Sequence, residues 1–81
     1  MALIKGNTMK KIMKERNAVH YEVDNTYTSF IDKEGNRILQ IDTYGSNQRE
    51  FRGKVSQSIQ FDKESAQEFL KVIKKEFNIK L

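Results

Sequence analysis

A polar stretch near the middle of the chain carries the residue types best suited to binding chemistry. It combines an aromatic residue, a glycine, a hydroxyl and three cations: Tyr44, Gly45, Ser46, Arg49, Arg52 and Lys54. Glycine permits close backbone approach, and a hydroxyl beside several cations suits a phosphate group, in a nucleic acid or in a nucleotide. The alternative interpretation is an ordinary solvated hairpin loop with glycine at its strained positions.

A second candidate lies directly after this stretch, where polar side chains recur at every other position. Ser56, Ser58 and Gln60 would share one side of an extended segment. Hydroxyls and amides can hydrogen-bond to bases or sugars without repelling a nucleic acid. The alternative is the solvent-facing side of an antiparallel sheet, which is commonly polar.

Catalytic and metal chemistry find little support in the residue types. The chain has no cysteine, and its single histidine, His20, has no partner at a recognisable catalytic or metal-binding spacing. No nucleophile–base pair is visible. We therefore predict no enzyme activity, no metal site and no cofactor.

The segment from residue 54 to residue 77 must position the second candidate. Period-two alternation predicts a half-buried strand over residues 54–61. The apolar period then changes to that of an amphipathic helix, with Asp62 as its N-cap. The helix carries an apolar stripe, in which Phe69, Ile73 and Phe77 are the residues we expect at a dimer interface.

The preceding part of the chain supplies the rest of the predicted sheet. Alternating or β-branched runs predict strands over residues 18–23, 26–31 and 37–44, with a hairpin turn at Gly35. The expected fold is α+β: a curved four-stranded antiparallel meander followed by the C-terminal amphipathic helix. Residues 18–81 would form one β-β-β-β-α domain, and residues 1–17 either a basic arm or a short helix.

Composition and charge limit the setting and the partners. The chain has 81 residues and a net charge of +4, with a surplus of four positive charges in residues 1–17 and a deficit of three in residues 18–44. A basic balance favours nucleic acid, but the acidic first strands reduce that preference. The absence of cysteine predicts a reducing, cytoplasmic setting, and no apolar run is long enough to span a membrane. A domain this small has a marginal core, so we expect a homodimer.

Three segments resemble the positive-cofactor-four type of single-stranded-DNA-binding transcriptional coactivators. They are Tyr27-Thr28-Ser29-Phe30-Ile31-Asp32-Lys33-Glu34-Gly35, Arg37-Ile38-Leu39-Gln40-Ile41-Asp42-Thr43-Tyr44 and Ser58-Ile59-Gln60-Phe61-Asp62-Lys63-Glu64. The resemblance covers about residues 18–78. It implies a homodimer that binds single-stranded DNA on its sheet, with Lys33 and Arg37 as phosphate contacts and Tyr44 as an aromatic near a strand end. The chain also resembles short uncharacterised proteins of bacteria and phages.

Two hypotheses of different classes follow. The first is a non-enzymatic, homodimeric module that binds single-stranded nucleic acid, DNA above all. The second is a small phage or mobile-element interaction protein that binds a host protein or a nucleotide. It is motivated by the small size, the acidic first strands and the presence of Gln57-Ser58 where the family has a Lys-Gly pair.

Overall fold

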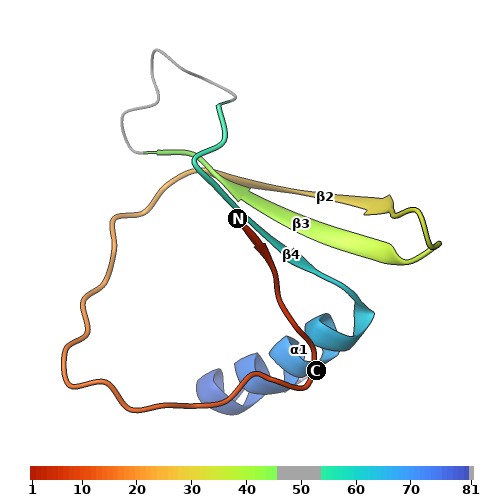
Figure 1. The fold of residues 1–81 in the computed structure, drawn as a ribbon. Helices are drawn as coiled ribbons and strands as arrows, with labels where there is room; N and C mark the ends of the chain where they lie inside the picture. The colour runs from red at the N-terminus through yellow and green to blue at the C-terminus, as the bar shows by residue number, and fades with distance from the viewer. Residues whose placement is uncertain (46–53, 81) are drawn as a thin grey trace.

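The computed structural model describes residues 1–45 and 54–80 and has the predicted α+β class (Figure 1). The described elements follow one another along the chain as β1 (Ala2–Leu3), β2 (Asn25–Ile31), β3 (Arg37–Thr43), β4 (Gln57–Phe61) and α1 (Lys63–Phe77). The four strands form one open sheet, and α1 continues from the end of β4 (Figure 1).

The sheet is mixed, whereas the sequence predicted a purely antiparallel meander. Its order is β1-β4-β3-β2, and β1 pairs with β4 in parallel. The β2–β3 and β3–β4 pairs are antiparallel, as expected for strands joined in sequence order. The parallel pair sets Ala2 against Ile59, and the Ile4 N–H donates to the Gln60 carbonyl at 2.9 Å.

Residues 18–23 do not form the predicted strand. They are exposed throughout, and Val19 is 100% exposed. Every residue of β2 is also exposed, so another strand outside it would find no covered face on which to bury its alternating apolar side chains. The fourth strand of the sheet is β1, which pairs with the opposite edge, at β4.

The N-terminal segment has no helix over residues 8–16. The chain turns at Asn7, which has a φ of 63°, and the Thr8 hydroxyl donates to the Lys5 carbonyl at 2.7 Å. The segment then passes the far end of α1, where Lys11 and Glu76 form an exposed ion pair at 3.3 Å, before returning to β2 (Figure 1). A segment of this length gains too little from helix formation alone to be stable in water.

Local sequence signals define the hairpin between β2 and β3. The Asp32 carboxylate accepts hydrogen bonds from the backbone N–H groups of Asn36 and Glu34, both at 2.9 Å. The bond from the Asn36 backbone is the main cause that lowers the pKa of Asp32 below its ordinary value of 3.8. Gly35 has the predicted positive φ, 84°, which glycine adopts with little strain.

The start of α1 is fixed by the predicted cap. The Asp62 carboxylate accepts from the Ser65 backbone N–H at 2.9 Å, and the Ser65 hydroxyl accepts from the Asp62 N–H at 3.0 Å. This is a capping box, in which two otherwise unpaired helix-end donors are satisfied. The Ser65 backbone bond lowers the pKa of Asp62 below 3.8. The helix ends at Asn78, which adopts the left-handed conformation of a C-cap.

The core of a single copy is small. Among the described residues, the buried hydrophobic side chains are Ile38 and Phe61. Phe61 stacks on Phe69 with a ring separation of 5.0 Å, which attaches α1 to the sheet. The chain exposes 7887 Å², whereas a compact monomer of 9.5 kDa exposes about 5000 Å². A single copy therefore exposes more surface than a compact domain of its mass, and Ile59, Leu70 and Phe77 are among its exposed apolar residues.

Candidate nucleic-acid interface

The two faces of the sheet carry different side chains because neighbouring residues of a strand point to opposite sides. One side, called the polar face, carries the aligned polar residues Thr26, Thr28, Gln40, Asp42, Ser58 and Gln60, with Phe30 and the buried Ile38 at its hairpin end. The apolar face is the opposite side and carries Tyr27, Ile31, Leu39, Ile41, Ile59 and Phe61, with the polar residues Ser29 and Arg37 toward the hairpin and Asn25, Thr43 and Gln57 at the other end. Helix α1 packs on the apolar face through Phe61 and Phe69.

The β3–β4 register creates a continuous hydrogen-bonded row on the polar face. Gln40 lies opposite Gln60, and Asp42 lies opposite Ser58. Gln60 Nε2 donates to Gln40 Oε1 at 2.8 Å, and Gln40 Nε2 donates to Asp42 Oδ1 at 2.9 Å. The Ser58 hydroxyl donates to the same Asp42 oxygen. Side chains held in this way present their remaining hydrogen-bonding atoms in fixed directions.

Asp42 is the buried end of this row. Its side chain belongs to a residue that is only 8% exposed, and its oxygen accepts from both Gln40 and Ser58. Among the described residues, no buried side-chain nitrogen or oxygen lacks a hydrogen-bond partner. The one carboxylate of the polar face is thus covered by an amide and a hydroxyl, which reduces its repulsion of an approaching phosphate.

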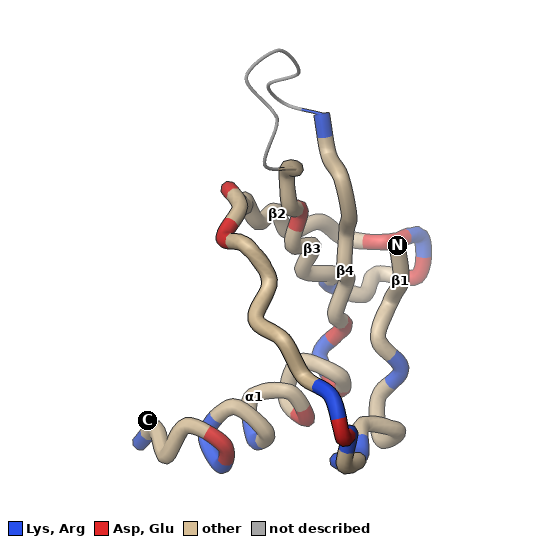
Figure 2. Tube along the Cα trace, turned by 90° about the vertical axis from the view of Figure 1, so that its left-hand side faces the viewer, with Lys and Arg blue, Asp and Glu red and all other residues tan. Residues whose placement is uncertain are grey.

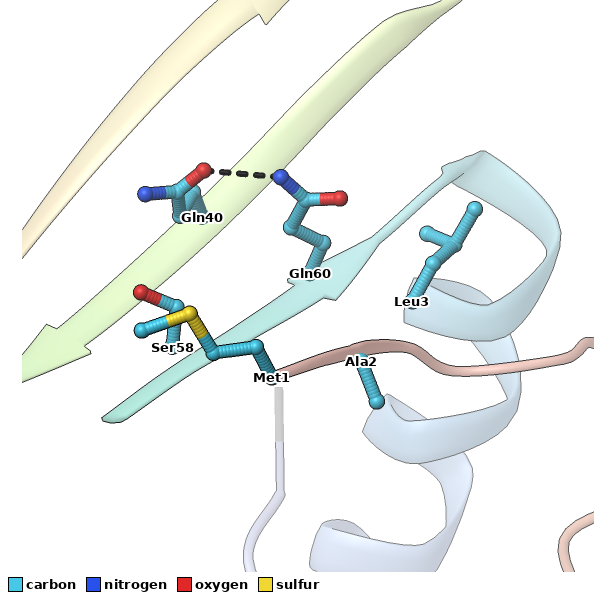
Figure 3. A pocket seen from close by; sticks show the side chains of 6 residues that line it. All are labelled: Met1, Ala2, Leu3, Gln40, Ser58 and Gln60. Atoms are coloured by element: carbon cyan, nitrogen blue, oxygen red, sulfur yellow. Dashed lines mark hydrogen bonds between the residues drawn. The ribbon is translucent and has the colours of Figure 1, made fainter.

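A pocket lies where the polar face meets β1. It has a volume of about 300 Å³ and is lined by Met1, Ala2, Leu3, Gln40, Ser58 and Gln60. Figure 3 shows the Gln40–Gln60 hydrogen bond beside the Ser58 and Met1 side chains, with Leu3 further along the N-terminal segment. Polar groups from β3 and β4 and apolar groups from β1 therefore share one small concave site.

Tyr44 extends the polar face beyond the end of β3. Its hydroxyl and the Thr26 hydroxyl are 2.9 Å apart and hydrogen-bonded, and its backbone N–H donates to the Asp24 carbonyl at 3.0 Å. The side chain is half-buried. Tyr44 is therefore held next to Asp42 and leaves part of its ring accessible.

The structure brings only some of the predicted binding residues together. Ser58 and Gln60 share the polar face, as their spacing predicted, and Ser56 precedes β4 with its N–H donating to the Thr43 carbonyl at 2.8 Å. Gly45 and Lys54 are the described residues on either side of residues 46–53, and Lys54 is exposed. Figure 2 shows β4 without charged residues between the basic position before it and the acidic position after it. Ser46, Arg49 and Arg52 lie outside the described residues.

The two hairpin cations lie apart from the polar row. Lys33 is exposed in the turn between β2 and β3, at the opposite end of β3 from Tyr44. Arg37 lies on the apolar face, where its guanidinium donates to the Ser29 hydroxyl at 3.3 Å. These two residues could contact a phosphate only at the hairpin end of the sheet.

Sequence reasoning missed several residues of the polar face and its pocket. Gln40 and Asp42 lie two residues apart, on either side of Ile41, and this spacing could have placed them on one face of the strand. The apolar run Ile38-Leu39 and Ile41 made the strand look apolar on both faces and hid that signal. Thr26 and Thr28 carry the same period-two signal in β2. The lining residue Leu3 carried no such signal, because the two-residue strand β1 is too short to show a period. Met1 precedes that strand and carried no signal either.

The predicted dimer residues lie along α1. Phe69 is half-covered by Phe61, Ile73 is partly exposed, and Phe77 is 72% exposed. Leu70 is 45% exposed beside them. The apolar stripe of α1 is therefore covered by the sheet only near its beginning.

Among residues 1–45 and 54–80, no group of three or more His, Asp or Glu side chains could hold a metal ion. No helix in that part of the chain is long and apolar enough to cross a membrane. Protein-family models, curated proteins and solved structures contain no match to this chain.

Proposed function

We propose that this chain is a non-enzymatic module that binds single-stranded nucleic acid, DNA above all, as a homodimer. The observation that carries the proposal is the hydrogen-bonded row on the polar face, in which the amides of Gln60 and Gln40 and the hydroxyl of Ser58 are ordered around the Asp42 carboxylate. Ordered amides and hydroxyls can bond to bases and sugars, and they repel no phosphate.

The aromatic and cationic groups needed for affinity lie at one end of this row. Tyr44 is held beside Asp42 with part of its ring accessible, which suits stacking on a base. Lys54 is exposed before β4. In the sequence, Arg49 and Arg52 lie between these two residues, and cations of this kind neutralise the phosphates of a nucleic acid.

The homodimer is supported by the uncovered apolar surface. Ile59 on the apolar face is 44% exposed, and the α1 stripe is open at Leu70 and Phe77. The surface in excess of a compact monomer is about 2900 Å², part of which belongs to the exposed segment before β2. A standard interface buries about 800 Å² on each partner, so the excess is large enough to supply one. A second copy would bring the same apolar surfaces, so the open apolar surfaces of the two copies could cover each other.

The non-enzymatic character is supported by the chemistry of the polar face. Apart from the Asp42 carboxylate, its polar groups are amides and hydroxyls, which are poor acids and bases at neutral pH. The Asp42 carboxylate is already engaged by Gln40 and Ser58. A general base must instead be able to reach a proton of the substrate.

The proposal is tested by fluorescence anisotropy of a labelled single-stranded oligonucleotide at 50 and 200 mM salt, with unlabelled duplex as competitor. If three phosphates are neutralised, affinity should fall roughly 20-fold between these concentrations. Duplex should compete poorly. Affinity that does not change with salt, or equal competition by duplex, would contradict the proposal.

A second candidate, an interaction protein with a host-protein partner, is favoured by one observation. Val19 and Tyr21, in the segment before β2, are 100% and 90% exposed, and such apolar side chains are common protein contacts. Absence of oligonucleotide binding at low salt would favour this candidate. Salt-sensitive binding that Arg49→Ala removes would argue against it.

A further inference from the structure

The direction of the hydrogen bonds in the polar row fixes how Gln60 faces the pocket. The Gln40 amide turns its NH₂ group toward Asp42, where Nε2 donates to the carboxyl oxygen Oδ1. Its oxygen then faces Gln60 and accepts from Gln60 Nε2. The Gln60 oxygen consequently points away from Gln40, as Figure 3 shows.

This orientation leaves one edge of the Gln60 amide available. Gln60 Nε2 uses one of its two N–H bonds on Gln40, and Figure 3 shows the Gln60 oxygen on the side of the amide away from Gln40. The second N–H lies on the same side of the planar amide as Oε1. Gln60 therefore presents an adjacent donor and acceptor, and it lines the pocket.

The remaining walls of the pocket suit a flat ring. Met1 and Leu3 of the N-terminal segment supply apolar side chains next to the amide row, and both are substantially exposed. A pocket of about 300 Å³ lies at the lower end of the range for small-ligand sites. An apolar wall and an amide edge together can take the face and the edge of one planar heterocycle.

We propose that this pocket holds one unpaired nucleobase of the bound nucleic acid, with its Watson–Crick edge hydrogen-bonded to the Gln60 amide. The inference rests on the proposed function and specifies how its central residue acts. Each of the four bases has an adjacent donor and acceptor on that edge, so the pocket accepts any of them. A duplex uses the same edge for base pairing, so the pocket rejects it.

In this arrangement Gln40 and Asp42 are positioning residues. They do not need to touch the base, because their hydrogen bonds hold the Gln60 amide in the orientation that a base requires. Without Asp42, the Gln40 amide could rotate and the direction of the row would no longer be fixed.

The test compares two labelled oligothymidylate probes of equal length by anisotropy at low salt. One carries ordinary thymine, and the other carries N3-methylthymine, which keeps the ring and the backbone but lacks the N3–H donor. The natural protein should bind the methylated probe about tenfold more weakly, the effect of one lost bidentate pair. Gln60→Leu should bind both probes equally.

Gln57→Leu is the matched control, because Gln57 is an exposed glutamine of the same β-strand on the opposite face. It should keep the tenfold discrimination. Far-ultraviolet circular dichroism checks that both variants fold. The comparison of the two probes on the natural protein needs no variant, so it decides the question even if Gln60→Leu does not fold.

The outcomes separate this inference from the proposed function. Salt-sensitive binding of both probes with equal affinity would overturn the base pocket and leave the proposed function standing. If neither probe binds, the proposed function fails, and thymidine monophosphate is compared with its N3-methyl form by amide NMR shifts at Gln60. A shift with the unmethylated nucleotide alone supports the pocket with a free nucleotide as its source, and no shift overturns it.

Discussion

The polar and apolar faces of the sheet differ in how far one copy of the chain satisfies them. The polar groups of the polar face are satisfied within the chain, since Gln40 and Ser58 both donate to Asp42 and Gln60 donates to Gln40. The apolar face is incomplete, since Ile59 remains 44% exposed while Phe61 is only 6% exposed beside it. A face with fixed polar groups is ready to bind a ligand. A face with open apolar groups still needs a covering surface.

The largest expected effect on stability comes from substituting Phe61, the buried residue of the apolar face among those described. Phe61→Ala removes the ring that stacks on Phe69 and should lower the free energy of unfolding by about 3–5 kcal/mol. For a domain this small, that is a large share of the total stability. Urea unfolding followed by circular dichroism measures it. Val19→Ala, at a fully exposed position, should change the unfolding free energy by less than about 0.5 kcal/mol. Equal effects of the two substitutions would contradict this account of the core.

The next effect concerns the part of the apolar surface that a second copy should cover. Phe77→Ser removes an exposed aromatic ring from the end of the α1 stripe. Each such ring contributes about 1.5–3 kcal/mol when buried, and a homodimer loses one from each copy, so the dimer Kd should rise at least about 100-fold. Sedimentation velocity over a dilution series measures the Kd. Lys71→Ser, an exposed position of the same helix outside the stripe, serves as the control. An unchanged Kd for Phe77→Ser would exclude this end of α1 from the interface.

A smaller effect is expected from breaking the polar row at its buried end. Asp42→Leu leaves the Ser58 hydroxyl and the Gln40 amide without their acceptor and should cost about 1–3 kcal/mol of stability. It should also weaken oligonucleotide binding without changing the dimer Kd. Asp42→Asn keeps an acceptor oxygen and should show less of both effects. Thermal unfolding and anisotropy measure them, and loss of the dimer in Asp42→Leu would show that the two faces are not independent.

The smallest effect lies at the cap between β4 and α1 and depends on pH. The folded-state pKa of Asp62 is lowered by the Ser65 backbone bond, so this carboxylate stabilises the fold above pH 3.8. That contribution is lost as the pH falls through the lower folded-state pKa. Asp62→Asn keeps the cap acceptor and should lose less stability below pH 3.8 than the natural protein does. Thermal unfolding between about pH 2 and pH 5 measures the difference. Parallel pH profiles would mean that the ionised cap contributes nothing.

Much of the fold could be predicted because its signals are local. The alternation of β4, the Asp62 cap, the stripe of α1 and the Gly35 turn each depend on residues close together in sequence, and each is present in the structure. The strand beside β4 could not be predicted, because Ala2–Leu3 is too short for a pattern and pairs with a segment far along the chain. Residues 18–23 show the opposite case, in which alternation exists without a neighbour to pair with.

The candidate site was predictable only in part for the same reason. The spacing of Ser58 and Gln60 placed them on one side of a strand, and the structure agrees. Their partners Gln40 and Asp42 come from another strand, so recognising the row requires the β3–β4 register. Arg37 lies on the opposite face because its position in β3 is one residue out of phase with Ile38 and Gln40.

The independence of the two faces is tested most directly by sedimentation velocity on the protein alone and with a saturating single-stranded oligonucleotide. The account predicts a particle with twice the 9.5 kDa mass of one chain in the first case. In the second case it predicts the same protein dimer with the oligonucleotide bound, because the polar face binds while the apolar face stays covered. A monomer in the absence of oligonucleotide, or a dimer that dissociates when the oligonucleotide binds, would contradict the account.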